Sequence, residues 1–416
     1  MPNTERLYYA DPYQREFSAR VIARRELEGQ PAVALDRTAF YPTGGGQPHD
    51  TGRLLPSGNA IAAARPGEDA GVGVLNVVAE DGLVWHILSA PLAADADAVT
   101  GALNWGRRLD HMQQHTGQHI LSQAFIRACD AETVAFHLGA ASSSIDLNRT
   151  DLSAEAVARA EAAANEIVDA ALDVSPTFVA PEELSALPLR KPPKVTEDIR
   201  IVQVAGFDWS ACGGTHVANT AQVGLIKLVA TERRGSELRV TFLCGGRARA
   251  DYARLHTLAQ GLVARFSTAQ DDLIEAVDRR AAELQAVRKE LTEMEGAWIE
   301  STGAALWTAA AGRGRTRVVA CAVDYPFERA KRIVQALRVR PGAVVLLGVR
   351  GERPQLIFAR ADDVVLDAGA LLRTAVAAGG GRGGGRPDFA QGGVPTNTGL
   401  DVALQAALLA LGINKE

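Results

Sequence analysis

The chain has 416 residues, of which 47% are hydrophobic and 22% charged. This composition is typical of a folded soluble protein with roughly two to four domains. We find no run of about 18 apolar residues and no charged leader followed by an apolar segment, so we expect neither a membrane-spanning helix nor an export signal. The four cysteines are widely spread, which argues against a disulfide scaffold and predicts a reducing, cytoplasmic location.

The charge is unevenly distributed along the chain, whose net charge is −5 at pH 7. The stretch from Ser301 to Glu416 carries 15 basic and 9 acidic residues, whereas the rest carries 29 basic and 40 acidic residues. A basic C-terminal quarter with a net charge of +6 on an acidic body suits the binding of a polyanion. The alternative is a solvated basic face that binds nothing.

Residues 1–105 are predicted to be mostly β-structure. Strand-like alternation occurs in Phe17–Ala23 and in Ala32–Asp36, and Val72–Val78 with Gly82–Ile87 predicts a further antiparallel pair. Glycine and proline recur between these segments. Many short strands separated by such turns predict a small β-barrel.

A glycine-rich string, FYPTGGGQP, lies within this region from Phe40 to Pro48 and is followed by Asp50 and Gly52. Three consecutive glycines carry no Cβ atoms, so the backbone can approach a ligand or another surface closely and offer its N–H groups. The string is therefore a candidate for a binding loop. The alternative is a tight turn of the barrel.

Residues 106–250 contain two clusters of candidate metal ligands. In the first, Arg108–Phe125 has the pattern of an amphipathic helix. His111, His115 and His119 are spaced four apart, so their rings project from one face of that helix. A single metal can bind one adjacent pair and not all three, and the spacing alone does not decide which pair.

The second cluster is the string CGGTH, in which Cys212 and His216 flank a Gly-Gly turn. Two imidazoles from a helix, one thiolate and one further imidazole form the kind of four-ligand set that zinc prefers. Each histidine alone could be an ordinary structural residue. An HxxxH pair together with a CxxxH pair predicts a zinc site.

The rest of residues 106–250 predicts an α+β fold, with helices packed against an antiparallel sheet. His137 lies on the opposite face of its strand from Phe136 and Leu138, so it is a candidate to point into a pocket, although a plain structural role is the alternative. The expected strands are Thr133–Leu138, Ser143–Leu147, Ile199–Val204, Leu225–Ala230 and Glu237–Leu243, with a long helix over Leu152–Leu172.

Residues 251–300 are predicted to be a helical connector. Apolar residues recur at heptad spacing at Val277, Leu284, Leu291 and Trp298, and charged residues fill most other positions. This pattern predicts a short coiled coil, formed either within one chain or between two chains. It does not fix the oligomeric state.

Residues 301–416 are predicted to form an α/β unit. Val318–Val323 and Ala343–Val349 are continuous apolar strands, and a helix is expected between them around 326–337. This order predicts a parallel βαβ crossover. A shorter strand is expected at Gln355–Ala359.

A glycine run that contains two arginines extends from Gly379 to Gly393, after a helix expected over Val364–Ala377. The run is either a flexible linker or, because the arginines shortly precede a helix, a cradle of backbone N–H groups for an anion. Asn397 or Thr398 is predicted to cap the last helix.

The strings HTGQH and CGGTH together resemble the editing domain of alanyl-tRNA synthetases and of the freestanding alanyl-tRNA editing proteins, the AlaX family. The string FYPTGGGQPxDxG is similar to the glycine-rich motif of that family. The resemblance implies the metal ligands His115, His119, Cys212 and His216, which leaves His111 outside the metal shell. It implies a substrate pocket lined by Thr43, Gly44, Gly45, Gly46 and Gln47, to which we add His137 as a candidate.

The string GGGRPDFAQGG resembles the C-terminal DHHA1 domain of alanyl-tRNA synthetases and of the long editing proteins. This resemblance implies a DHHA1-like tRNA-binding domain over residues 301–416. The implied tRNA-contacting residues are Gly383, Gly384, Gly385, Arg386 and Gln391.

The resemblance therefore predicts a zinc-dependent trans-editing hydrolase that deacylates mischarged tRNA for alanine, with Ser-tRNA as main substrate and Gly-tRNA as a second candidate. Because the barrel starts near residue 1, we expect the editing and C-terminal parts without an aminoacylation core. The expected partner is tRNA for alanine. A homodimer through the helical connector or the C-terminal domain is left open.

Other classes of function fit parts of the sequence. A non-catalytic tRNA-binding protein would use the zinc only for structure, but the pairing of metal ligands with a glycine-rich loop favours an enzyme. A zinc-dependent hydrolase of another ester would not need the basic C-terminal unit. A DHH-type phosphoesterase would need an Asp-His-His motif, which the sequence lacks.

Overall fold

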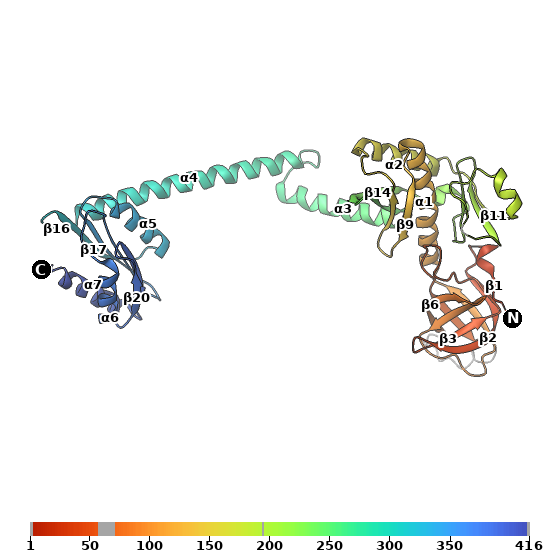
Figure 1. The fold of residues 1–416 in the computed structure, drawn as a ribbon, viewed down its shortest axis with the longest axis horizontal. Coiled ribbons are helices and arrows are strands. Elements are labelled where there is room, and N and C mark those ends of the chain that lie inside the picture. The colour runs from red at the N-terminus through yellow and green to blue at the C-terminus, as the bar shows by residue number, and fades with distance from the viewer. Residues whose placement is uncertain (1–2, 57–70, 194, 414–416) are drawn as a thin grey trace. The chain divides into compact units, whose positions relative to one another are not determined.

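The computed structural model describes residues 3–56, 71–193 and 195–413. Contacts within the chain group it into two compact units, Met1–Gly261 and Leu262–Glu416 (Figure 1). The first unit contains both the region predicted as a barrel and the region predicted as α+β. Among the helices of the described residues, none is long and apolar enough to cross a bilayer.

Six antiparallel strands close into a barrel at the start of the first unit, as predicted for residues 1–105. Alternate residues of the first barrel strand are buried, among them Phe17 and Ala19, because successive side chains of a strand point to opposite faces. They pack with Leu54 and Val99 in the barrel core. Around the barrel the strands are β2 (Glu16–Leu27), β3 (Gln30–Leu35), β7 (Leu83–Leu88), β6 (Val72–Glu80), β5 (Gly52–Pro56) and β8 (Ala98–Leu103).

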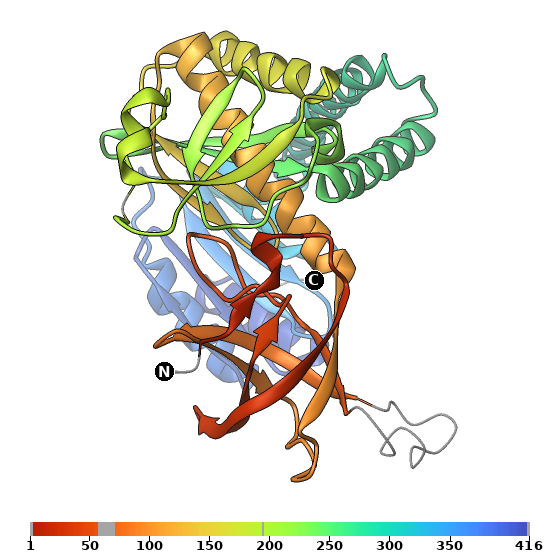
Figure 2. The same ribbon diagram turned by 90° about the vertical axis from the view of Figure 1, so that its right-hand side faces the viewer.

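The helix α1 (Trp105–Cys129) leaves the barrel and runs towards α2 (Ala154–Asp169), as the orange ribbon in Figure 2 shows. The side chain of Asn104 caps its first turn, and Asp130 ends it in a left-handed conformation with φ 50°. Every residue from His111 to Ser122 is buried. The predicted helix is therefore correct, but its middle is enclosed on all faces and not amphipathic.

One glycine allows this enclosure. A Cβ atom on Gly117 would lie 2.3 Å from the Sγ atom of Cys244, so only glycine lets α1 pack this closely against the neighbouring strand. The glycine of the HTGQH string is thus explained by packing. It brings the helix that carries His115 and His119 against the sheet.

Two antiparallel sheets complete the first unit, which confirms the predicted α+β pattern. The larger sheet packs against α1 and α2 around a core that includes Met112, Phe125, Ile145 and Val240. Its strands, in spatial order, are β14 (Ile226–Arg234), β15 (Glu237–Cys244), β10 (Ser143–Leu147) and β9 (Thr133–Leu138). The smaller sheet consists of β11 (Val174–Val179), β12 (Ile199–Val204) and β13 (Asp208–Ala211). Among the described residues of the first unit, the remaining short elements are β1 (Glu5–Arg6), β4 (Arg37–Thr38) and the 3-10 turns η1 (Leu7–Tyr9), η3 (Pro181–Ala186) and η4 (Thr220–Val223).

The predicted helical connector consists of two helices, α3 (Gly245–Phe266) and α4 (Leu273–Thr308). Every residue of α4 from Val277 to Met294 is exposed, including the heptad residue Leu291, whose exposed fraction is 61%. The heptad positions Val277, Leu284 and Leu291 thus lie on the surface of the single chain, whereas Trp298 is partly buried and packs against the core of the second unit. Their pairing in a coiled coil stays a prediction.

A six-stranded sheet forms the centre of the second unit. The end of α4 and α5 (Phe327–Arg338) cover one face, while α6 (Ala368–Ala378) and α7 (Asn397–Ala410) cover the other. The first long strand runs parallel to the next, with α5 between them, which confirms the predicted βαβ crossover. In spatial order the strands are β16 (Ala311–Arg313), β17 (Thr316–Val323), β18 (Ala343–Val349), β19 (Gln355–Arg360), β21 (Phe389–Gly393) and β20 (Arg382–Gly385).

The glycine run forms two paired strands, β20 and β21, so its description as a flexible linker is wrong, while the cradle for an anion stays a prediction. A Cβ atom on Gly383 would lie 2.6 Å from the Cα atom of Gly392, and the two strands are therefore too close for larger residues. The cap of α7 is also different from the expectation. The side chain of Thr396, and not that of Asn397 or Thr398, accepts the cap hydrogen bond.

Candidate metal centre

The two predicted ligand clusters meet at one point in the first unit. His115 and His119 project from α1, and Cys212 and His216 lie on the loop after β13. One ligand atom from each of the four residues lies within 4.8 Å of the others. The Sγ atom of Cys212 is 3.3 Å from Nε2 of both His115 and His216. This group of four could hold a metal ion.

A different residue lies beside the Nδ1 atom of each histidine in the cluster. Nδ1 of His115 is 2.8 Å from Gln47 Oε1, Nδ1 of His216 is 3.2 Å from Thr116 Oγ1, and Nδ1 of His119 is 3.3 Å from Asp208 Oδ2. When an acceptor holds the Nδ1 proton, the lone pair of the ring is on Nε2. Gln47 Oε1 can only accept, so the Nε2 atom of His115 is the one available to a metal, as in metal sites with outer-shell partners.

Two of the four groups in the cluster have pKa shifts that suit a metal. Burial raises the pKa of the Cys212 thiol, but the neighbouring His115 and His216 outweigh it, so that this pKa falls well below its usual range. Burial is also the main cause that lowers the pKa of His216 to about 3. Burial lowers the pKa of His119, but the neighbouring Asp208 and Cys212 outweigh it, so that this pKa is raised. The Cys212 thiolate and the neutral imidazole of His216 are forms that bind zinc, since ligands must be deprotonated.

Glycines bring the glycine-rich loop and the ligand loop close to the cluster. A Cβ atom on Gly214 would lie 2.2 Å from the ring of His115, which explains a glycine of the CGGTH string. Gly46 has φ 79°, and a Cβ atom there would lie 2.4 Å from the ring of Phe136. That ring lies 5.9 Å from the ring of His115, so the loop, Phe136 and the metal cluster are neighbours.

Comparisons with known proteins identify the family of this chain. The family model for the threonyl and alanyl tRNA synthetase second additional domain matches residues 199–239, and the DHHA1 domain model matches residues 316–411. The alanyl-tRNA editing protein AlaX-L of Pyrococcus horikoshii is 30% identical over 410 residues, which cover 96% of this chain and 98% of that protein. The chain belongs to the AlaX family of alanyl-tRNA editing proteins. This membership confirms the predicted resemblance and the predicted class of enzyme, an aminoacyl-tRNA hydrolase of alanyl-tRNA editing.

Alanine–tRNA ligases are also similar to this AlaX family member. Those of Pyrobaculum neutrophilum and Pyrococcus abyssi are 33% and 29% identical over 94% of the chain. The chain spans only 43% and 42% of their lengths. Among solved structures, the C-Ala domain from Aquifex aeolicus alanyl-tRNA synthetase matches 23% of the chain at 22% identity, with a TM-score of 0.22.

The residues that the sequence proposed for the substrate pocket of this AlaX family member differ in their exposure to solvent. Thr43 is exposed, and its hydroxyl is 3.0 Å from Nδ1 of His49. Gly44 and Gln47 close the turn of the loop through two backbone hydrogen bonds, with Gly45 and Gly46 exposed between them. The side chain of Gln47 is not open to a substrate, because the residue is 1% exposed.

The other two candidates lie apart from the four ligands. His137 is exposed on β9, while Phe136 from the opposite face of that strand contacts the cluster, so a pocket role for His137 stays a prediction. His111 is buried on α1 but is not one of the four clustered ligands, and burial lowers its pKa to about 4. This placement agrees with the expectation that His111 lies outside the metal shell.

Two residues of the site were missed by the sequence analysis. Asp208, which contacts His119, precedes the Cys212 ligand by four residues, and a carboxylate near a ligand could have suggested a partner for a metal-bound histidine. No feature of the sequence indicated that Phe136 belongs to the site. Its strand was recognised, but the distance to the loop at Gly46 depends on the tertiary fold.

The residues predicted to bind tRNA lie at one edge of the sheet in the second unit. Gly383, Gly384 and Gly385 belong to β20, and Gln391 is exposed on the neighbouring β21. The side chain of Arg386 is 77% exposed and lies 3.3 Å from Asp388. These residues therefore share one hairpin whose polar side chains reach the surface.

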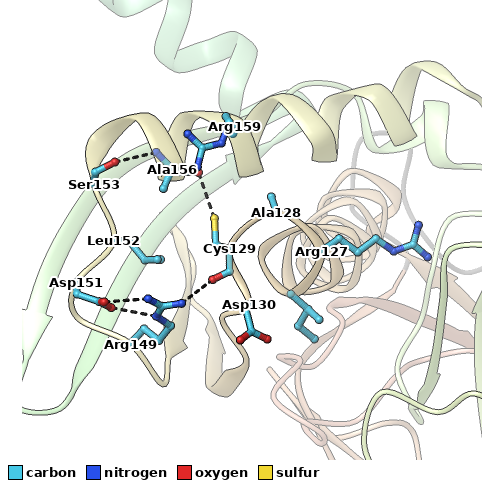
Figure 3. A pocket seen from close by; sticks show the side chains of 11 residues that line it. Arg127, Ala128, Cys129, Asp130, Arg149, Asp151, Leu152, Ser153, Ala156 and Arg159 are labelled. Carbon is cyan, nitrogen blue, oxygen red and sulfur yellow. Dashed lines mark hydrogen bonds and ion pairs between the residues drawn. The ribbon is translucent and has the colours of Figure 1, made fainter.

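A separate hollow of about 510 Å³ lies where α1 ends and α2 begins (Figure 3). Arg149 forms a two-pronged ion pair with Asp151 there and donates a hydrogen bond to the carbonyl of Cys129. None of the four clustered ligands lines this hollow. The metal cluster and the hollow are thus two different places on the first unit.

Proposed function

We propose that this AlaX family member is a zinc-dependent hydrolase that removes serine from mischarged tRNA for alanine, with glycine as a second amino acid that it removes. The observation that carries the proposal is the position of the four ligand atoms, within 4.8 Å of one another and beside the glycine-rich loop. The name of the similar AlaX-L protein supports the proposal.

In this proposal His115, His119, Cys212 and His216 hold the zinc through three Nε2 atoms and one thiolate. The donor set fits zinc, because imidazole nitrogens and thiolates are its usual ligands. A side-chain oxygen also lies 2.8 to 3.3 Å from each Nδ1 atom. When bound, zinc supplies a local positive charge that can orient a carbonyl or amino group of the substrate. The ring of Phe136 and the exposed glycines of the loop form the adjacent wall.

The same loop is proposed to distinguish serine from alanine. The two amino acids differ by one hydroxyl, and a site that hydrogen-bonds this hydroxyl rejects a substrate without it far more strongly than an apolar pocket can. Thr43 is exposed in the loop, and its hydroxyl, which lies 3.0 Å from Nδ1 of His49, is the candidate for this contact. His137 is a further candidate for the rim of the pocket.

The second unit is proposed to bind the tRNA and to contribute to a homodimer. The basic balance of residues 301–416 and the exposed residues Arg386 and Gln391 support contact with phosphates. The exposed apolar positions of α4, among them Leu284 and Leu291, support pairing with a second copy through the connector.

The direct test compares the release of amino acid from Ser-tRNA and Ala-tRNA for alanine by the zinc-loaded protein. We expect rapid release of serine and little release of alanine. Cys212→Ser should abolish the activity, whereas Cys129→Ser, which changes a cysteine outside the cluster, should retain it. Equal release from both substrates would contradict an editing role, and tRNA binding without any release would favour a non-catalytic binding protein.

A further inference from the structure

Gln47 connects three segments of the chain at the metal cluster. It belongs to the glycine-rich loop, and its Oε1 atom accepts hydrogen bonds from Nδ1 of His115 at 2.8 Å and from the backbone N–H of Thr215 at 3.0 Å. Its Nε2 atom donates to the hydroxyl of Thr215 at 2.8 Å. One buried amide therefore joins the helix of the HxxxH pair to the loop of the CxxxH pair.

We infer that Gln47 is a positioning residue for the metal ligand His115 and does not read the serine side chain directly. This inference rests on the metal site of the proposed function and is independent of the amino acid that is removed. The role differs from the one that the glycine-rich motif implied for Gln47. The reason is that its oxygen and one of its two amide hydrogens are already bonded inside the protein.

The chemistry of an amide suits this role. The carbonyl oxygen can only accept, so it fixes the proton of His115 on Nδ1 and leaves the Nε2 lone pair towards the metal. The bond from Gln47 Nε2 to Thr215 fixes the orientation of the amide, since a flipped amide would place two donors against Nδ1–H and the Thr215 N–H. Unlike Asp208 beside His119, the amide adds no negative charge near the Cys212 thiolate.

The packing around this amide leaves little freedom. Gln47 is 1% exposed and His115 is 0% exposed. A Cβ atom on Gly214, the residue before Thr215, would lie 2.9 Å from the Gln47 oxygen and 2.2 Å from the ring of His115. The glycine in the ligand loop thus makes room for the hydrogen bond between Gln47 and His115.

The test measures metal binding and not activity alone. Gln47→Met removes the acceptor but keeps the volume, and we expect it to weaken zinc affinity by about 10- to 100-fold, the usual loss for an outer-shell partner. With Co²⁺ as the probe, the visible absorption of the bound ion should change, because His115 no longer has a fixed ring orientation. Gln47→Glu keeps an acceptor for Nδ1–H and should bind zinc within a few fold of the wild-type protein.

Gln114→Met is the matched control. Gln114 is also a fully buried glutamine, one residue from His115, but its amide bonds the backbone of Cys244 and not a metal ligand. This variant should lose thermal stability and keep its zinc affinity and its Co²⁺ spectrum. A decrease in zinc affinity as large as that of Gln47→Met would mean that loss of packing, and not loss of the acceptor, weakens binding, and would overturn the inference.

The remaining outcomes separate this inference from the proposed function. If the wild-type protein binds zinc and Gln47→Met binds it equally well, the inference is wrong and the proposed metal site stands. A Gln47→Glu variant that binds zinc as poorly as Gln47→Met would also overturn it. If the wild-type protein itself binds neither Zn²⁺ nor Co²⁺, the proposed metal site fails, and the inference fails with it.

Discussion

Arg108 and Asp50 form an ion pair in which both side chains are fully buried, with an exposed fraction of 0%. The Nε atom of Arg108 is 3.0 and 3.2 Å from the two carboxylate oxygens, and the backbone N–H of Tyr41 donates to the same carboxylate. Asp50 closes the glycine-rich string, and Arg108 lies two turns before His115 on α1. The ion pair therefore anchors the glycine-rich loop to the helix that carries two of the proposed metal ligands, His115 and His119.

Replacement of Asp50 by asparagine should strongly destabilise the first unit. The substitution keeps the shape but leaves the buried guanidinium of Arg108 without a negative partner, which typically costs about 3–5 kcal/mol. Urea unfolding followed by circular dichroism would measure this loss. In the control Asp251→Asn, which breaks an exposed pair with Arg254, the loss should stay below about 1 kcal/mol. Equal losses in the two variants would contradict the anchoring role.

The choice between the two histidine pairs on α1 gives a second prediction. His119→Ala should lose zinc, because it removes one of the four clustered ligands, whereas His111→Ala should retain about one zinc per chain. Zinc content after dialysis, measured by atomic absorption on protein of known concentration, would test this. Release of zinc by His111→Ala together with retention by His119→Ala would show that the other pair binds the metal.

The sequence was sufficient to predict the ligand clusters and most of the elements around them. The spacing of His115 and His119 needs only the helical repeat, and the short Gly-Gly turn keeps Cys212 and His216 together. The barrel and the βαβ crossover were also predictable, since their strands alternate or are continuously apolar. These features depend on residues that are close along the chain.

The parts that were missed depend on contacts between distant residues. Nothing local indicates that Gln47 bonds His115 and Thr215 instead of facing a substrate, or that Phe136 covers Gly46. The glycine run of the second unit was misread for the same reason. Its composition is that of a linker, and only the close approach of β20 to β21 shows why glycine is required.

The buried His86 in the barrel predicts a loss of stability in mild acid. Burial lowers the pKa of His86 to about 4, although its ring is hydrogen-bonded to Val33 and Thr38. The unfolded chain takes up this proton near pH 6.5 and the folded chain only near pH 4, so folding stability falls as the pH drops between these values. For one such group, the free energy of unfolding falls by about 2 kcal/mol from pH 7 to pH 5.

The variant His86→Gln isolates this contribution. Between pH 7 and pH 5, the free energy of unfolding of the wild-type protein should fall by about 2 kcal/mol more than that of the variant. The difference isolates His86, because the two proteins share all other titrating groups. Thermal or urea unfolding of both proteins at the two pH values would measure the difference. The same pH dependence in both proteins would rule out His86 as its source.

The exposed arginine of the β20–β21 hairpin gives a prediction about tRNA binding. If Arg386 neutralises a phosphate of the tRNA, its removal takes away one counterion-releasing contact. Arg386→Ala should then weaken tRNA binding and reduce the slope of log affinity against log salt by about 1. Filter binding or fluorescence anisotropy over a range of salt concentrations would give both quantities.

Arg280→Ala provides the control for this measurement. Arg280 is an exposed arginine on α4 that pairs with Glu283, so its replacement changes the net charge of the second unit by the same amount. If only the overall charge attracted the tRNA, the two variants would weaken binding equally. A specific contact at the hairpin requires a reduced slope for Arg386→Ala and an unchanged slope for Arg280→Ala. An unchanged slope for Arg386→Ala would exclude a phosphate contact at this residue, because removal of such a contact also removes its contribution to the salt dependence of binding.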